Sequence, residues 1–162
     1  MLSIAICDDD IQLTGSMERL VEKIARRNFV DTDIEVFWDG KSLADAVIAG
    51  DSFDIIYLDI EMSGEDGISA AKRIRQYDKN ALIIYVTSHE NHMKESFEVR
   101  PFQFLVKPVS EDQMEACFKA AYEDINRSDF YFRYSYQRMN HKVPVRDILY
   151  FESKKRKVFI CL

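Results

Sequence analysis

An uninterrupted apolar segment, Ile55-Ile56-Tyr57-Leu58, runs directly into the carboxylate of Asp59. A short apolar run without polar alternation is typical of a central strand in a parallel sheet, buried on both faces. Ligands of such sheets bind outside the carboxyl ends of the strands, so Asp59 is a candidate site residue. The alternative is that Asp59 only opens a turn, where Asp is common because it hydrogen-bonds locally.

Four other apolar segments resemble this one and alternate with stretches of helical periodicity. We expect strands over 4–7, 34–37, 55–58, 82–86 and 102–106, and helices over 13–24, 42–49, 66–74, 91–98 and 114–125. Asp66 suits a helix N-cap and Gly50 a C-cap. Parallel neighbours need helical crossovers of one hand, so the pattern predicts an α/β fold: a doubly wound, flavodoxin-like five-stranded parallel sheet of order 2-1-3-4-5 with helices on both faces.

Composition narrows the class of protein. With 47% hydrophobic and 31% charged residues, the chain is typical of a soluble globular protein, and it has no apolar run long enough to span a bilayer. We therefore expect a cytoplasmic protein without membrane contact. The three cysteines (Cys7, Cys117, Cys161) lack metal or disulfide spacing, so we expect them to be reduced. His89 and His92 lack partner ligands, which disfavours a metal site there.

The last 35 residues differ in charge and periodicity. Residues 128–162 contain eight basic and three acidic residues, against 14 basic and 25 acidic residues in 1–127. Residues 130–136 alternate with period two, which indicates a strand. Further short strands are expected over 143–145, 148–151 and 158–162, with a polar turn over 153–157. We divide the chain into a domain over 1–127 and a β-rich extension over 128–162, which we expect to be the start of an incomplete second domain.

The predicted topology brings five polar residues to one edge of the sheet: Asp8, Asp9, Asp59, Thr87 and Lys107. Crowded carboxylates repel one another unless a cation is bound, and Mg²⁺ prefers oxygen ligands. Beside a metal ion and an ammonium group, an Asp oxygen can attack phosphorus, because both cations stabilise the phosphoryl oxygens.

These residues lie in segments that strongly resemble the receiver domain of two-component response regulators, over about residues 1 to 127. The matching segments are Ile6-Cys7-Asp8-Asp9, Leu58-Asp59-Ile60-Glu61-Met62, Asp66-Gly67, Val86-Thr87-Ser88 and Phe104-Leu105-Val106-Lys107-Pro108.

The resemblance implies that Asp59 accepts a phosphoryl group from a sensor histidine kinase. Asp8 and Asp9 would hold Mg²⁺ together with Asp59 and the main-chain carbonyl of Glu61, and Lys107 would contact the phosphoryl group. The protein would then be a signalling domain with intrinsic phosphotransfer and autodephosphorylation chemistry, not an enzyme with a separate substrate.

The resemblance also implies a switch, in which the Thr87 hydroxyl moves toward the phosphoryl group while the Phe104 ring changes position. It implies a cis Lys107-Pro108 bond. Many receivers carry a proline where this chain has Ser63, so we expect a more mobile loop there. Glu61 and His89 occupy positions that influence phosphate lifetime in the family, in a direction that the sequence does not fix.

The segment Val143 to Glu152 resembles the opening of a LytTR-type DNA-binding domain, which implies transcriptional output. The cations of Lys154 to Lys157 are either a DNA phosphate contact or a solvated hairpin turn, and we favour the turn. We therefore expect DNA binding by the complete output domain but not by residues 1–162. The family implies a homodimer through residues 90 to 126, and exposed strand edges in the tail could pair between chains.

Two other functions remain open. One is an enzyme that uses Asp59 as a nucleophile, as in haloacid-dehalogenase-like phosphatases. Those enzymes carry their acid pair on the first strand, whereas Asp59 follows the third. The other is a free-standing receiver that acts through protein contacts alone, against which the basic, strand-forming tail argues.

Overall fold

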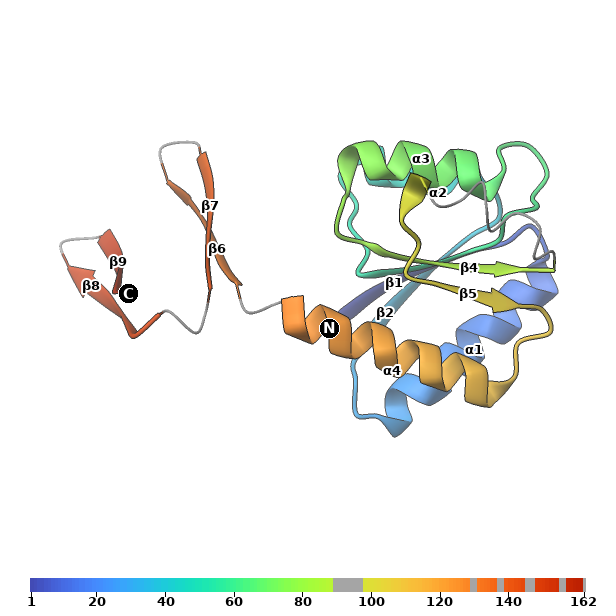
Figure 1. Cartoon of the computed structure of the whole chain (residues 1–162), viewed down its shortest axis with the longest axis horizontal. Coiled ribbons are helices and arrows are strands. Elements are labelled where there is room, and N and C mark those ends of the chain that lie inside the picture. Colours follow the sequence, from blue (N-terminus) through green and yellow to red (C-terminus); the bar gives the residue numbers. More distant parts are fainter. Residues whose placement is uncertain (89–97, 129–130, 137–138, 145–147, 155–156, 162) are drawn as a thin grey trace. The chain divides into compact units, whose positions relative to one another are not determined.

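The computed structural model describes residues 1–88, 98–128, 131–136, 139–144, 148–154 and 157–161. The chain divides into two compact units, Met1–Ala121 and Tyr122–Leu162. Each is treated separately below, and Figure 1 shows the elements of both. Among the described residues, no helix is both long and apolar enough to cross a membrane.

The first unit is built on a five-stranded parallel sheet. Its strands are β1 (Leu2–Cys7), β2 (Thr32–Phe37), β3 (Ile55–Leu58), β4 (Leu82–Thr87) and β5 (Gln103–Val106). They lie in the order β2-β1-β3-β4-β5, and every neighbouring pair is parallel. This confirms the predicted strand order. All carboxyl ends therefore meet at one edge, where Cys7 is level with Leu58.

Helices cover both faces of the sheet, as Figure 1 shows: α2 and α3 lie over one face, and α1 and α4 over the other. The helices are α1 (Ile11–Arg27), α2 (Gly40–Ala49), α3 (Gly67–Tyr77) and α4 (Glu111–Ser128). Ion pairs of 2.7 Å join Glu111 of α4 to both Lys23 and Arg27 of α1, which places these helices side by side. Most of the helix expected over 91–98 falls outside the described residues.

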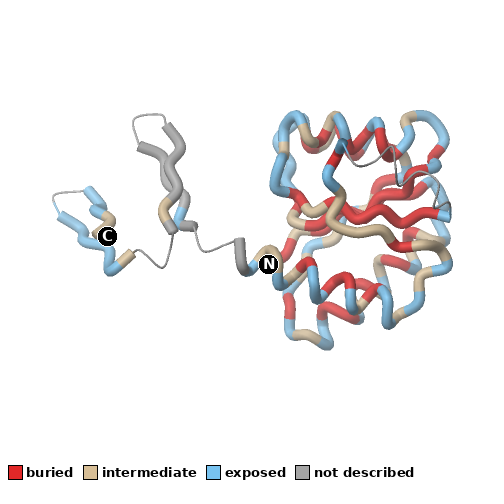
Figure 2. The backbone as a smooth tube through the Cα atoms, in the orientation of Figure 1, coloured by how far each residue is buried: buried red, intermediate tan, exposed pale blue. Residues whose placement is uncertain are grey.

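The core consists of the central strands and the helix faces against them, coloured red in Figure 2. All four residues of β3 are fully buried, as expected for a strand covered on both sides. Ile56 and Leu58 belong to the apolar cluster beneath α2 and α3. Tyr57 alternates with them and faces the other side of the sheet, which α1 and α4 cover.

Local chemistry sets the helix ends. Asp10, Asp39 and Asp66 are N-caps whose carboxylates accept main-chain N–H groups of the first turn of α1, α2 and α3. Gly50 ends α2 with φ +119°, a left-handed conformation that glycine adopts without the steric penalty of a side chain. The caps expected at Asp66 and Gly50 are thus confirmed.

The second unit holds two antiparallel hairpins. One pairs β6 (Tyr131–Tyr136) with β7 (Met139–Pro144), and the other pairs β8 (Tyr150–Lys154) with β9 (Lys157–Cys161). β7 begins four residues before the strand expected at Val143, because its polar residues pair with β6 without showing a period of two themselves.

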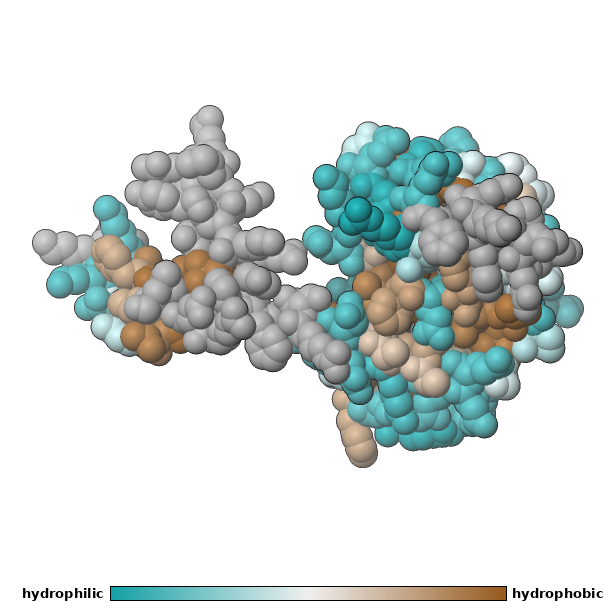
Figure 3. Space-filling model, viewed as in Figure 1, coloured by the Kyte–Doolittle hydropathy of each residue, from teal (hydrophilic) through white to brown (hydrophobic). Residues whose placement is uncertain are grey.

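The polar turn expected over 153–157 is wrong at three positions. Ser153 pairs with Val158, and Lys154 pairs with Lys157, so the ladder continues into the polar segment and leaves only 155–156 between the strands. Two residues are enough to join antiparallel strands, which explains the shorter connection. Several large hydrophobic side chains in or beside this hairpin are exposed: Leu149, Tyr150, Phe151, Val158 and Phe159. Figure 3 shows brown, hydrophobic surface in this unit.

Candidate functional site

Four of the five residues expected at one sheet edge lie at a strand end or directly after one, and the fifth, Asp9, follows Asp8. Asp8 comes directly after β1, Asp59 after β3 and Lys107 after β5, while Thr87 is the last residue of β4. Parallel pairing sets the strands level, since Thr87 pairs with Val106 of β5. Asp8 and Asp59 are almost fully buried, at 2% and 6% exposure. Buried carboxylates need a partner, and the site provides one.

That partner is Lys107. Its Nζ donates to Asp59 Oδ2 at 2.8 Å and to Asp8 Oδ2 at 2.6 Å. Its main-chain N–H donates to the Thr87 carbonyl at 2.9 Å, which fixes the start of the side chain at the end of β4. One ammonium group therefore bridges two carboxylates that the chain places 51 positions apart.

Main-chain donors hold the other carboxylate oxygens. Asp59 Oδ1 accepts the Ile60 N–H at 2.7 Å, and Asp8 Oδ1 accepts the Asp10 N–H at 2.9 Å. Both buried acids are therefore held in fixed orientations by main-chain groups of the chain itself.

Burial and neighbouring charges shift the pKa values of Asp59 and Lys107. Burial raises the pKa of Asp59, and the Asp8 carboxylate raises it further, against the opposing effect of Lys107. Burial alone would lower the pKa of Lys107, but hydrogen bonds and charges from Asp59 and Asp8 outweigh it, so its pKa lies above the ordinary value. The lysine is thus held in its cationic form.

Asp9 is exposed and tied to a second loop. Its Oδ2 accepts the Ser63 main-chain N–H at 2.8 Å, and this hydrogen bond, followed by one from the Ser63 side chain, holds the pKa of Asp9 below its usual range. A proline at position 63 would have no N–H to donate. The departure from the family pattern thus creates a link between the β1–α1 and β3–α3 loops, while the expected mobility of the β3–α3 loop stays a prediction.

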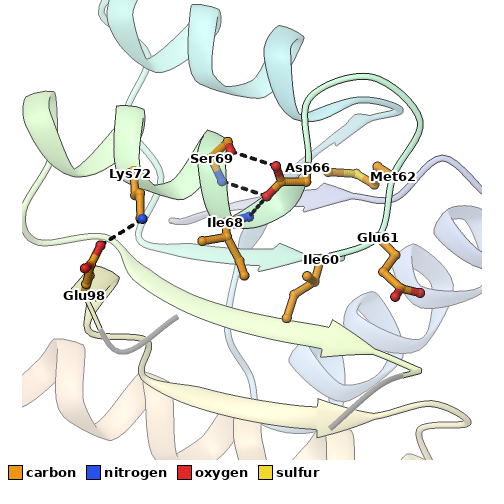
Figure 4. Close-up of a pocket in the computed structure, with 8 residues that line it drawn as sticks. All are labelled: Ile60, Glu61, Met62, Asp66, Ile68, Ser69, Lys72 and Glu98. Atoms are coloured by element: carbon orange, nitrogen blue, oxygen red, sulfur yellow. Dashed lines mark hydrogen bonds and ion pairs between the residues drawn. The ribbon is translucent and has the colours of Figure 1, made fainter. Parts of the chain in front are cut away.

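The donor set fits a hard divalent cation. Asp8, Asp9 and Asp59 each offer a carboxylate oxygen, and the three oxygens lie within 4.8 Å of one another. Mg²⁺ is bound by a few carboxylates together with water, so this arrangement suits it. The side chain of Glu61, the fourth expected ligand, is exposed and is drawn in Figure 4 beyond the end of β3. Only its main-chain carbonyl was expected to bind metal.

The expected switch residues lie on adjacent strands. Thr87 is fully buried, whereas Phe104 of β5 is partly exposed. The Phe104 ring stacks on Tyr85, with ring centroids 5.3 Å apart and planes 27° apart. The expected cis bond between Lys107 and Pro108 is also present.

The structure gives Gly67 a role that the sequence motif did not explain. A Cβ atom at this position would overlap the Asp59 carbonyl oxygen, so no other residue fits without moving the backbone. The Gly67 N–H also donates to the Ile60 carbonyl at 2.9 Å. The start of α3 is thereby pressed against the residue that follows β3, and this close approach positions Asp59.

Figure 4 shows a pocket of about 810 Å³ beside this junction. On the wall of this pocket, the Asp66 carboxylate accepts the main-chain N–H groups of Ile68 and Ser69. At the other end of the pocket, Lys72 pairs with Glu98 at 2.8 Å.

Asp8, Asp59 and Lys107 together form a carboxylate–lysine centre at the carboxyl edge of the sheet. The doubly wound sheet places the first unit in the class of flavodoxin-like α/β domains. Residues 4–119 match the family model for the response regulator receiver domain. The chain belongs to this family, and the matched part is a signalling domain of a two-component system.

Several curated relatives are similar to the chain. The sensory transduction protein LytT of Bacillus subtilis is 24% identical over 133 residues, which cover 78% of this chain and 50% of that protein. The positive alginate biosynthesis regulatory protein of Pseudomonas aeruginosa is 31% identical over 121 residues, covering 74% of this chain and 47% of that protein. The chain thus spans about half the length of these relatives.

A third relative aligns along almost the whole chain. The transcriptional regulatory protein YpdB of Escherichia coli is 22% identical over 173 residues, which cover 98% of this chain and 69% of that protein. Among solved structures, the response regulatory domain of mrkE from Klebsiella pneumoniae has a TM-score of 0.69 at 21% identity, covering 78% of this chain and 99% of that one. This likeness supports the fold.

Proposed function

We propose that the chain is part of a phosphorylation-dependent response regulator in which Asp59 accepts a phosphoryl group from a sensor histidine kinase in the cytoplasm. One observation carries the proposal: the buried Asp59 carboxylate shares the Lys107 ammonium group with Asp8. A carboxylate that is buried, held by a cation and adjacent to further metal-binding oxygens can act as a nucleophile toward phosphorus.

In the proposed transfer, an Asp59 oxygen forms a bond to phosphorus as the phosphorus–nitrogen bond of a phosphohistidine breaks. The departing imidazole nitrogen keeps the electron pair of that bond. Lys107 holds the acceptor carboxylate in place and binds the transferred phosphoryl oxygens. Asp8, Asp9, Asp59 and the main-chain carbonyl of Glu61 would hold Mg²⁺, which supplies positive charge to the phosphoryl oxygens.

The switch would begin at Thr87, whose hydroxyl would bind the phosphoryl group. Phe104 would respond by changing the position of its ring. Two features support this part of the proposal: Thr87 ends β4 beside the acceptor, and Phe104 stacks on Tyr85, two residues before Thr87. Phosphorylation is a local change of charge, and such a change acts globally only by biasing an element that has two arrangements.

Residues 128–162 would be the start of a LytTR-type DNA-binding domain that follows a receiver over 1–127. Support comes from the two hairpins, from their exposed hydrophobic side chains and from the alignment of nearly the whole chain with a relative named as a transcriptional regulator. The complete output domain would bind DNA, and residues 1–162 alone would not. Phosphorylation would promote a homodimer through residues 90 to 126.

The acceptor chemistry can be tested with Mg²⁺ and acetyl phosphate, followed by intact mass spectrometry. We expect one phosphoryl adduct, which needs the metal and is absent in Asp59→Asn. If no adduct forms, the proposal that Asp59 is a phosphoryl acceptor is wrong. Steady hydrolysis of p-nitrophenyl phosphate instead would favour a phosphatase. For the output, a gel-shift assay should show DNA binding only with a longer chain.

A further inference from the structure

A second pocket lies at the carboxyl-terminal end of α3, the opposite end of this helix from the carboxylate–lysine centre. It has a volume of about 330 Å³. Its lining residues are Arg75, Lys79, Glu98, Val99 and Arg100. Four of these five side chains are charged, and three of them are cations, in a chain with a formal net charge of −6. The pocket is therefore positively charged, although the chain as a whole is negatively charged.

The one carboxylate of the pocket is already paired. Glu98 forms an ion pair with Lys72 at 2.8 Å, as Figure 4 shows. Within the part of the chain that the structure describes, no carboxylate forms an ion pair with Arg75, Lys79 or Arg100. Among the described residues, these three cations therefore have no carboxylate paired with them.

Arg75 is partly buried and is held by main-chain carbonyls. Its Nε donates to the Val99 carbonyl at 2.9 Å, and its Nη1 donates to the Asp78 carbonyl at 3.4 Å. The Asp78 carboxylate acts on Arg75 through its charge, and its Oδ1 accepts the N–H groups of Asn80 and Ala81. A guanidinium group has five N–H donors, and these two hydrogen bonds use two of them. Burial of this cation is costly, and an anion would offset the cost.

Arg100 adds a second observation. Its φ is +51°, in the left-handed region that non-glycine residues rarely adopt. Backbone conformations of this kind persist only where the surroundings hold them, and they cluster at binding sites and active sites. Here the conformation belongs to the residue that brings the third cation to the pocket.

We propose that Arg75, Lys79 and Arg100 form a binding site for the phosphate group of a small molecule, either inorganic phosphate or a phosphate monoester. Arginine binds phosphate oxygens through its planar fork of N–H groups, and lysine adds a compact charge. A volume at the low end of small-molecule sites suits one tetrahedral oxyanion. The site is independent of the chemistry proposed for Asp59.

Isothermal titration calorimetry tests the proposal, with inorganic phosphate and adenosine monophosphate as probes. The titrations are done at low ionic strength, where charge attraction is least screened, and with a chelator present to exclude metal from the acidic centre. The double variant Lys79→Gln/Arg100→Gln removes two exposed cations. Arg19→Gln, on α1, removes an exposed cation elsewhere and is the matched control.

We expect saturable binding by the wild-type chain, at least about tenfold weaker binding by the double variant, and unchanged binding by Arg19→Gln, because charge-assisted hydrogen bonds are lost only from the pocket. Equal affinity for both probes supports the phosphate group alone as the ligand, and tighter binding of the nucleotide supports a monoester. Absence of saturable binding, or equal binding by the double variant and the wild type, overturns the proposal. Thermal melts confirm that each variant is folded.

Discussion

The Nζ atom of Lys107 lies 2.8 Å from Asp59 Oδ2, so the residue after the fifth strand neutralises the residue after the third. The same nitrogen binds Asp8, and the ammonium group occupies the position between two buried acids. The Asp59 carboxylate is therefore held in place by groups of the chain itself.

Lys107→Met should slow adduct formation from acetyl phosphate by at least about tenfold, because a positioned cation that binds developing charge is lost. The affinity of this variant for Mg²⁺ should equal or exceed that of the wild type, because the Lys107 ammonium group no longer competes for the carboxylates. Both effects are measurable, the first by intact mass against time and the second by fluorescence of Trp38, the only tryptophan. Lys119→Met, which removes an exposed ion pair on α4, should behave as wild type. Equal rates for the two variants would contradict the role given to Lys107.

Ser63→Pro should raise the pKa of Asp9 toward its ordinary value, because the main-chain N–H that stabilises the ionised carboxylate is removed. Carbon-detected NMR titration of the side-chain carboxyl measures this shift. Ser63→Ala keeps the main-chain donor and should shift the pKa less than Ser63→Pro does. If both variants titrate as the wild type does, the link between the two loops does not exist in solution.

Gly67→Ala should destabilise the protein by about 3 kcal/mol, because its Cβ would overlap the Asp59 carbonyl. Gly15→Ala provides a control of opposite sign. This glycine lies inside α1, where an added Cβ has ordinary contacts, so alanine should stabilise by about 0.5 to 1 kcal/mol. Urea unfolding measures both. A Gly67→Ala variant as stable as the wild type would show that the start of α3 is not pressed against Asp59.

Asp66→Ala should lower the free energy of unfolding at neutral pH by about 1 kcal/mol through loss of the helix cap. Burial tends to raise the pKa of Asp66, but hydrogen bonds from Ser69 and Ile68 outweigh it, so the folded-state pKa is lowered. The ionised cap therefore stabilises above the unfolded-state pKa of about 4, and this stabilisation is lost as the pH falls through the folded-state value.

The difference in unfolding free energy between the wild type and Asp66→Ala should accordingly shrink on acidification from about pH 5 to about pH 2, as measured by urea unfolding across that range. Asp66→Asn keeps a capping oxygen but has no titrating group, so the free energy of unfolding of this variant should lack this pH-dependent contribution. A difference that stays constant with pH would show that the charge of Asp66 does not contribute.

The strand order followed from the sequence because buried parallel strands are continuous apolar runs and their crossovers have one hand. Asp8, Asp59 and Lys107 follow such runs directly, so their meeting at one edge was predictable. The hydrogen bonds between these side chains could not be predicted from the sequence pattern, because they depend on the direction that each side chain takes after its strand ends.

Two features of the site could not be predicted from local sequence. The hydrogen bond from Ser63 to Asp9 joins loops 54 positions apart and depends on a main-chain group that every residue except proline has. The close approach of Gly67 to Asp59 depends on the angle between β3 and α3, although the Asp66-Gly67 pair was a signal that could have suggested it. In the tail, Met139 to Lys142 pair with β6 despite a polar sequence.

The most direct test of the central claim locates the phosphoryl group itself. After treatment with Mg²⁺ and acetyl phosphate, sodium borohydride converts an aspartyl phosphate into homoserine, and peptide mass spectrometry then identifies the altered residue. We predict homoserine at position 59, dependent on Mg²⁺, with Asp8 and Asp9 unchanged. Homoserine at either of those positions instead, or at no position, would contradict the assignment of Asp59 as the phosphoryl acceptor.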